Sequence, residues 1–222
     1  TERIKVYGEK ALLLSRSRQA AAKKLEQQVI RLLKEIGMAK MRFQVDFQWL
    51  ENERGIFQHQ GKSYQGDEWG VDQIEFFISP NPGEDFKPLA KIASGGEISR
   101  IMLALKNILA ESDRIPLLIF DEIDAGVSGQ IALAVGKSIQ NLAQTHQIIC
   151  ITHLPQIAAF GKAHYKVEKY VDDGRTFTRV NVLAGEDRVK EIASLMGGKK
   201  LSEEIFQSAR QLIKEAAEQL TE

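Results

Sequence analysis

The sequence predicts an α/β fold in which helices flank a parallel sheet, preceded by the end of a coiled coil and a small antiparallel β region. Two apolar runs, at 117–120 and 147–152, have the length of buried strands, and a helical pattern at 128–144 separates them. Aromatic and β-branched residues in 43–50 and 73–79 are typical of strands. Strands that alternate with helices indicate a parallel sheet.

The first helix carries apolar residues at alternating three- and four-residue spacings and ends at Gly37. The apolar positions are Ala22, Leu25, Val29, Leu32 and Ile36. This pattern covers about two heptads, so a coiled coil and an ordinary amphipathic helix explain it equally well.

Glycines interrupt the stretch between the first two strands, which predicts a hairpin or a small antiparallel sheet with long turns. Within it, Gly61-Lys62-Ser63 resembles the end of a phosphate-binding loop (P-loop). Such a loop has the form Gly-x-x-x-x-Gly-Lys-Ser/Thr and follows an apolar strand. Here five residues separate Gly55 from Gly61, and charged residues precede Gly55. We therefore interpret this stretch as a hairpin turn and find no P-loop in the sequence.

The remaining elements follow in chain order. We expect a helix over 95–111, a strand that ends at Asp121, a helix over 128–144, a strand over 147–152, strands over 164–171 and 176–183 joined by the turn 172–174, and helices over 186–196 and 202–220.

A chain of 222 residues with 43% hydrophobic content can bury a core of its own. Its formal net charge of zero excludes a polycation that coats nucleic acid as a whole. Residues 1–42, however, hold 11 lysines and arginines against 4 acids. This basic arm fits either a solvated helix surface or attraction to a phosphate backbone. Its basic residues include Arg16, Arg18, Lys23, Lys24, Arg31 and Lys34.

The single cysteine, Cys150, lies among isoleucines, which predicts a small core residue and permits no disulfide within the chain. We see no signal peptide and no apolar stretch long enough to cross a bilayer, so we expect a cytosolic protein without a membrane partner. The chain opens with Thr1 in the middle of a helical pattern, so we also expect a piece of a longer polypeptide.

Ser94, Gly95, Gly96 and Glu97 stand at the start of the helix over 95–111. As a capping box, the Ser94 hydroxyl accepts from a first-turn amide and Glu97 reaches back to the cap amide. The two glycines also leave backbone amides uncovered at the positive end of the helix dipole, where proteins hold phosphate. The tetrapeptide alone is a weak signal.

The strand over 117–120 delivers Asp121 and Glu122 to the carboxyl edge of the sheet, and the next strand delivers His153 to the same edge. One acid can support a hydrated Mg²⁺ ion, the other can orient an attacking water, and the imidazole can contact a γ-phosphate. Acids often end buried strands, and a lone histidine is often an ordinary loop residue. The conjunction of the three groups therefore carries the hypothesis of an ATP-hydrolysing site.

The order of these motifs resembles the carboxy-terminal lobe of a P-loop ATPase head of the ABC type, in the SMC group. Within that group, residues 120–129 (Phe-Asp-Glu-Ile-Asp-Ala-Gly-Val-Ser-Gly) and 151–156 (Ile-Thr-His-Leu-Pro-Gln) are most similar to the RecN family of bacterial double-strand-break repair. The resemblance covers nearly the whole chain. It implies the end of a coiled coil at 1–40, a head lobe at 41–185 and carboxy-terminal helices at 186–222.

The resemblance also implies a role for each motif. Asp121 would be the Walker B acid that supports Mg²⁺, Glu122 the general base and His153 the switch histidine. Residues Ser94, Gly95, Gly96 and Glu97 would form the signature that touches ATP on an opposing head. Residues Asp124, Ala125, Gly126 and Ser128 would belong to the D-loop at the dimer interface, although Ser128 stands where many relatives carry Asp.

The implied assembly is a homodimer whose heads sandwich ATP, with the P-loop supplied by the amino-terminal half of the same polypeptide. It would bind DNA without sequence preference, in the bacterial cytoplasm at the nucleoid. We therefore expect the chain alone to be nearly inactive.

Two alternatives stay open. One is the nucleotide-binding subunit of an ABC transporter, although Ile123-Asp124 and Glu97 depart from the transporter pattern. The other is a non-catalytic structural clamp, although both acids and the histidine are present. The roles of Arg100 and Lys106, on the signature helix, stay undecided between contact with the nucleotide or opposite head and simple surface positions.

Overall fold

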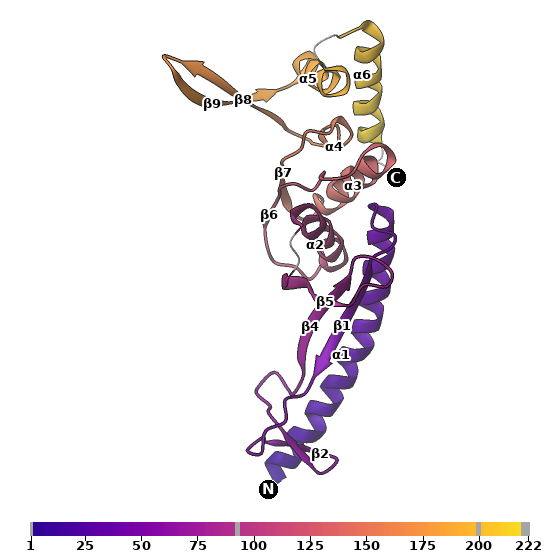
Figure 1. Cartoon of the computed structure of the whole chain (residues 1–222), viewed down its shortest axis with the longest axis vertical. Coiled ribbons are helices and arrows are strands. Elements are labelled where there is room, and N and C mark those ends of the chain that lie inside the picture. Colours follow the sequence, from indigo (N-terminus) through magenta and orange to yellow (C-terminus); the bar gives the residue numbers. More distant parts are fainter. Residues whose placement is uncertain (1, 92–93, 199–200, 219–222) are drawn as a thin grey trace. The chain divides into compact units, whose positions relative to one another are not determined.

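The computed structural model describes residues 2–91, 94–198 and 201–218, and the chain forms two compact units, Thr1–Ser94 and Gly95–Glu222 (Figure 1). The division falls inside the predicted head lobe, and the predicted boundaries at 40 and 185 stay predictions. Within the described ranges, no helix combines the length and the apolar character needed to cross a membrane.

The first unit sets a long helix beside small antiparallel sheets. Its elements are α1 (Glu2–Glu35), β1 (Arg42–Gln48), β2 (Phe57–His59), β3 (Lys62–Tyr64), β4 (Gln73–Ser79), β5 (Lys87–Pro88) and the short 3₁₀ helix η1 (Leu89–Lys91). Strand β4 lies between β1 and β5, and β2 pairs with β3. The small antiparallel β region predicted from the glycine-rich sequence is confirmed.

The turn between β2 and β3 consists of Gln60 and Gly61, which have positive φ angles of 49° and 80°. Two left-handed residues match the twist that a tight hairpin requires. Lys62 and Ser63 lie in β3, and the Lys62 ammonium pairs with Glu51. The stretch that resembles the end of a P-loop is therefore a hairpin, as predicted.

The apolar stripe of α1 packs within its own unit. Ala22, Val29 and Ile36 are buried, and α1 lies against β1. Glu26 of α1 also accepts a hydrogen bond from the backbone N of Val45, at 2.7 Å. An amphipathic helix packed on a sheet accounts for these positions, and a coiled-coil partner for α1 stays a prediction.

A buried carboxylate, Asp72, ties α1 to the β region. Its side chain is 0% exposed and accepts hydrogen bonds from Ser15 Oγ (2.6 Å), Trp49 Nε1 (2.9 Å) and Arg18 Nη1 (3.2 Å). Arg18 belongs to the predicted basic arm, but it is an ion-pair partner inside the unit and not an unengaged surface charge.

Replacing Asp72 with Ala should lower the free energy of unfolding by about 3 kcal/mol, because the Trp49 N–H and the Arg18 guanidinium would lose their acceptor. Both tryptophans, Trp49 and Trp69, lie in the first unit, so their fluorescence during urea unfolding measures the change. The matched variant Asp85→Ala removes an exposed carboxylate and should cost less than about 0.5 kcal/mol. Equal losses in the two variants would contradict this role for Asp72.

The second unit follows the α/β order expected from the sequence. Its elements are α2 (Gly95–Leu109), β6 (Leu117–Phe120), α3 (Gly129–Leu142), β7 (Gln147–Cys150), α4 (Pro155–Ala158), β8 (His164–Asp172), β9 (Arg175–Leu183), α5 (Gly185–Gly197) and α6 (Glu203–Glu218). Strands β6 and β7 are parallel. Ile101, Leu103 and Val135 are completely buried in this unit. Among the described elements of this unit, only the short α4, which Pro155 opens, lies outside the predicted ones.

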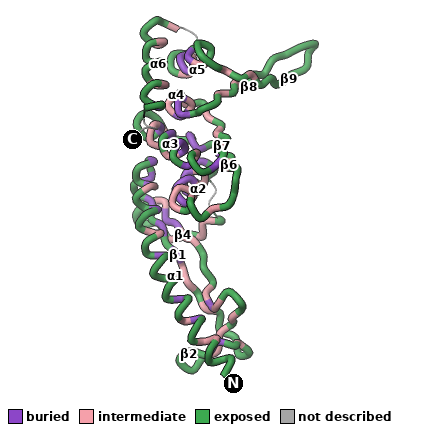
Figure 2. The backbone as a smooth tube through the Cα atoms, turned by 180° about the vertical axis from the view of Figure 1, so that it is seen from behind, coloured by how far each residue is buried: buried purple, intermediate pink, exposed green. Residues whose placement is uncertain are grey.

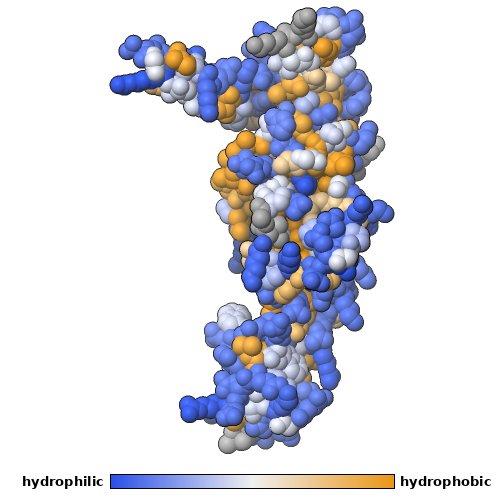
Figure 3. All heavy atoms as spheres, viewed as in Figure 1, coloured by the Kyte–Doolittle hydropathy of each residue, from blue (hydrophilic) through white to orange (hydrophobic). Residues whose placement is uncertain are grey.

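One face of the β6–β7 pair is covered and the other is bare. Phe120 is buried and Leu118 half-buried, whereas Ile119 and Ile151, on the opposite face, are 62% and 56% exposed. Figure 3 shows hydrophobic atoms gathered over these strands. We call Leu117, Ile119, Ile149 and Ile151 the apolar sheet face. Parallel sheets normally have both faces covered, and this face has no cover among the described residues.

Strands β8 and β9 form an antiparallel hairpin that is exposed over most of its length (Figure 2). Its turn consists of Asp173 and Gly174, with φ angles of 46° and 71°. The hairpin predicted from residues 172–174 is thereby confirmed.

Candidate functional site

The carboxyl ends of β6 and β7 meet at one edge of the sheet. Phe120 is in register with Cys150, and the backbone N of Ile151 donates to the Phe120 carbonyl, at 2.9 Å. Asp121 and Glu122 therefore leave the sheet at the same edge as Thr152 and His153. The adjacent strand ends thus place the acid pair and the histidine loop at one edge, and the roles of these residues stay predictions.

Asp121 and Glu122 form a tight, exposed turn after β6. Oδ1 of Asp121 accepts a hydrogen bond from the Glu122 backbone N, at 2.9 Å. Glu122 has a φ of 56°, a left-handed conformation that is uncommon for a residue other than glycine. Such backbone outliers concentrate at functional sites, and here both carboxylates are open to a ligand.

The Asp124 carboxylate is 6% exposed and joins the two loops. It accepts hydrogen bonds from Thr152 Oγ1 (2.6 Å) and from the His153 backbone N (2.9 Å), and its Oδ2 lies 3.0 Å from His153 Nδ1. Burial is the largest influence and pushes the pKa of Asp124 up, but these contacts together outweigh it and hold the pKa below its usual value. The His153 ring itself stays 75% exposed.

The predicted signature begins α2 and rests on the turn after Asp121. A Cβ atom on Gly96 would lie 2.7 Å from Ala125 Cβ and 2.9 Å from the Glu122 carbonyl oxygen, so only glycine permits this approach. A Cβ on Gly95 would meet the Glu122 carboxylate. Ser94 is exposed and Glu97 is half-buried. Gly95 and Gly96 thus lie beside Glu122 of the same chain, and the contact of the predicted signature with an opposing head stays a prediction.

Arg100, whose role the sequence left undecided, is 8% exposed and holds the turn that contains the predicted D-loop. Its Nη1 donates to the carbonyls of Ile123 (3.2 Å) and Ala125 (2.7 Å), and burial lowers the pKa of its guanidinium. Ser99 Oγ adds a hydrogen bond to the Asp121 carbonyl, at 2.8 Å. The sequence does hold a signal for Arg100, because it falls midway between Gly96 and Ala104 on the buried side of α2.

Lys106, in contrast to Arg100, has a structural role away from the candidate site. Its ammonium pairs with Asp113, in the segment after α2, and both side chains are largely buried, at 16% and 12% exposure. Lys106 is therefore a structural ion-pair partner within its own unit.

The remaining residues of the predicted D-loop are exposed to solvent. Ala125, Gly126 and Ser128 are exposed. Ser128 precedes α3 in an extended conformation, and its side chain makes no cap hydrogen bond to that helix. These residues are accessible, as a dimer contact requires, and the dimer contact stays a prediction.

Cys150 behaves as the core residue that the sequence predicted. It is a free thiol, partly buried in β7. Burial, followed by the charges of Asp124 and Asp121, raises the pKa of the thiol to about 12. The thiol is therefore protonated at neutral pH and is a poor nucleophile.

The described residues include no cluster of three or more His, Cys, Asp or Glu side chains that could cage a metal ion. Mg²⁺ in nucleotide sites usually keeps several waters and is held by one or two carboxylates together with the phosphates. The exposed Asp121 at the sheet edge fits that mode of binding.

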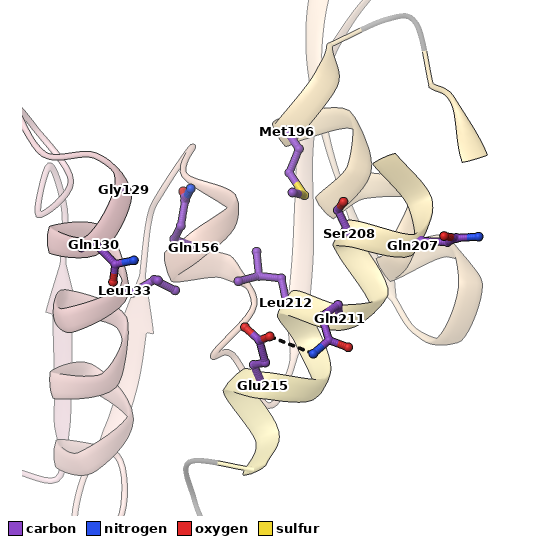
Figure 4. A pocket seen from close by; sticks show the side chains of 10 residues that line it. All are labelled: Gly129, Gln130, Leu133, Gln156, Met196, Gln207, Ser208, Gln211, Leu212 and Glu215. Carbon is purple, nitrogen blue, oxygen red and sulfur yellow. Dashed lines mark hydrogen bonds between the residues drawn. The ribbon is translucent and has the colours of Figure 1, made fainter. Parts of the chain in front are cut away.

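A groove of about 700 Å³ lies elsewhere in the second unit (Figure 4). It is lined by Gly129, Gln130, Leu133, Gln156, Met196, Gln207, Ser208, Gln211, Leu212 and Glu215. On the α6 side of the groove, Gln211 Nε2 donates a hydrogen bond to Glu215 Oε1, at 2.8 Å. None of the predicted catalytic residues lines this groove, although Gly129 directly follows Ser128 of the predicted D-loop.

The chain is similar to curated DNA repair proteins, although no protein-family model matches it. It is 39% identical over 206 residues to the DNA repair protein RecN of Bacillus subtilis, an alignment that covers 91% of this chain and 36% of that protein. It is 41% identical over 206 residues to the RecN of Treponema pallidum, which covers 93% of this chain and 35% of that protein. The chain thus spans about a third of the length of these relatives.

Solved structures with a similar fold are SMC head domains. The Smc head with a coiled coil and joint from Pyrococcus yayanosii covers 83% of this chain and 30% of its own, with a TM-score of 0.52 and 23% identity. The Smc head from Pyrococcus furiosus bound to the C-terminal domain of ScpA covers 86% of this chain and 42% of its own, with a TM-score of 0.50 and 21% identity. These matches confirm the predicted head fold. The sequence comparison confirms the resemblance carried by the motifs, since about nine-tenths of the chain matches the carboxy-terminal part of RecN proteins.

Proposed function

We propose that the chain is the carboxy-terminal lobe of an SMC-like head that hydrolyses ATP and acts on DNA in double-strand-break repair. The observation that carries the proposal is the arrangement of Asp121, Glu122 and His153 at one edge of the β6–β7 pair. Two acids and an imidazole at the carboxyl edge of a parallel sheet suit the transfer of a phosphoryl group to water.

Each group has a defined task in this reaction. Glu122 accepts a proton from the attacking water and orients it. Asp121 supports the Mg²⁺ ion that accompanies ATP and offsets the charge of its phosphates. The exposed ring of His153 contacts the γ-phosphate or the attacking water. Gly95, Gly96 and the first turn of α2 offer backbone amides to the γ-phosphate held by an opposing head.

The apolar sheet face supports a second part of the proposal, that the amino-terminal half of the same polypeptide completes the head. The RecN relatives are about two and a half times as long as this chain. A parallel sheet needs cover on both faces and the reaction needs a P-loop. We propose that the amino-terminal half supplies the cover and the P-loop. Its strands and P-loop would then pack on the apolar sheet face, which consists of Leu117, Ile119, Ile149 and Ile151.

Two completed heads would close as a homodimer around two ATP molecules, in the bacterial cytoplasm at the nucleoid. The DNA surface we propose is the exposed side of α1. Arg16, Lys23, Lys24 and Lys34 are exposed there, whereas Arg18 is engaged by Asp72 and Arg31 pairs with Glu35. Contacts of this kind are independent of sequence and weaken steeply as salt concentration rises.

The proposal is tested by ATP hydrolysis with and without the amino-terminal half. The chain alone should release almost no phosphate, because it lacks a P-loop. Co-expression with the P-loop half should restore hydrolysis, and the variant Asp121→Ala should abolish the restored activity. Robust hydrolysis by the chain alone, insensitive to Asp121→Ala, would overturn the proposal.

A further inference from the structure

Two hydrogen bonds and an imidazole nitrogen meet at one oxygen of Asp124. Oδ2 accepts from Thr152 Oγ1 (2.6 Å) and the His153 backbone N (2.9 Å), and it faces His153 Nδ1 at 3.0 Å. The side chain is 6% exposed, so it has little access to a nucleotide or to a second chain. The buried Asp124 side chain thus contacts the loop that carries His153, and a place for Asp124 at a dimer interface stays a prediction.

The contact with Nδ1 determines where the histidine proton lies. Hydrogen bonds to Asp124 hold the pKa of its carboxyl below the usual value, so at neutral pH the group is ionised and can only accept. The tautomer with the proton on Nδ1 has an N–H beside this oxygen, whereas the other tautomer would have a lone pair beside it, so the charge of Asp124 favours the proton on Nδ1. Nε2, across the ring, then carries the lone pair, and the ring is 75% exposed.

We propose that Asp124 is a positioning residue for His153: it fixes the tautomer with the proton on Nδ1 and presents Nε2 as the working nitrogen. The tautomer of His153 does not depend on the proposed function. The reaction in which Nε2 takes part does rest on it. In that reaction, Nε2 accepts a hydrogen bond from water.

Hydrogen bonds also hold the backbone on both sides of Asp124. Arg100, on the signature helix, binds the carbonyls of Ile123 and Ala125, the two neighbours of Asp124. Thr152 Oγ1 also accepts from the Leu154 backbone N, at 3.1 Å, which fixes the loop that carries His153. Arg100 therefore joins α2 to the backbone on both sides of Asp124, and the Asp124 side chain contacts the imidazole.

Nitrogen-15 NMR of the imidazole rings tests the tautomer in the chain itself, without nucleotide. The chain has four histidines, and comparison with His153→Gln assigns the signals of His153. At a pH where the ring is neutral, we expect the proton on Nδ1 and an unprotonated Nε2. A neutral His153 ring protonated on Nε2 in the unmodified chain would overturn the proposal, and this readout depends on no destabilising variant.

Two variants separate positioning from general support of the loop. Asp124→Ala removes the acceptor and should shift the neutral ring towards the Nε2-protonated form. Thr152→Val removes a different hydrogen bond to the same oxygen and should leave the His153 tautomer unchanged. A tautomer that is unaltered in folded Asp124→Ala would also overturn the proposal.

ATP hydrolysis by the polypeptide that includes the P-loop half distinguishes this inference from the proposed function. Asp124→Ala should lower kcat about tenfold or more with little change in KM, and adding it to His153→Gln should cause no further loss. Additive losses would show that Asp124 acts independently of His153. Wild-type hydrolysis by His153→Gln would contradict the proposed function, while the tautomer of His153 would still decide the role of Asp124.

Discussion

Replacing Glu122 with Gln should lower ATP hydrolysis by the complete polypeptide by about a hundredfold to ten-thousandfold, with ATP binding retained. The amide keeps the shape of the carboxylate but cannot accept the proton of the attacking water. Glu122 stands exposed on a turn fixed by the Asp121 carboxylate and by a left-handed backbone, so the substitution should leave the turn in place. ATP should then persist in the site and the closed dimer should accumulate. Phosphate release and light scattering in the presence of ATP measure the two effects.

The matched control is Glu111→Gln, which removes an exposed carboxylate just beyond α2 and should hydrolyse ATP at the wild-type rate. Unchanged hydrolysis in Glu122→Gln would remove Glu122 from the role of general base. Loss of ATP binding by Glu122→Gln would assign the carboxylate to binding of the nucleotide or its Mg²⁺ ion.

The elements that the sequence predicted are those whose signals are local. The apolar runs of β6 and β7 and the hairpin turns at Gly61 and Gly174 each depend on a few adjacent residues, and the structure has them where the sequence indicated. The meeting of Asp121 with the loop that carries His153 was also predictable, because parallel strands share a carboxyl edge.

The features that escaped prediction depend on contacts between distant segments. No local pattern shows that Asp124 turns inward to His153 while Asp121, three residues earlier, stays exposed. The same holds for the two carbonyls that Arg100 binds, which lie beyond the next strand, although the spacing of α2 does place Arg100 on its buried side. The apolar stripe of α1 has a spacing that suits a helix or a sheet as partner, so only the packing against β1 decides what covers it here.

Replacing Ile119 with Glu should have opposite effects on the chain and on the completed head. In the isolated chain, Ile119 is 62% exposed, so a carboxylate there should leave folding intact and reduce self-association through the apolar sheet face. In the completed head, the same carboxylate would be buried against apolar strands without a partner. We expect the affinity for the P-loop half to fall by about 3 kcal/mol or more, which is at least a hundredfold.

Sedimentation of the chain alone and titration with the P-loop half measure these opposite effects. The control Ile131→Glu places the same charge on an exposed apolar residue of α3, which is 37% exposed and lies off the sheet, and should assemble normally. If both variants assembled with wild-type affinity, the apolar sheet face would not be the contact surface for the amino-terminal half. If both failed, the charge would be acting through general destabilisation, which the urea midpoint of each variant would reveal. The proposed assembly therefore requires that Ile119→Glu lose its affinity for the P-loop half while its urea midpoint stays at the wild-type value.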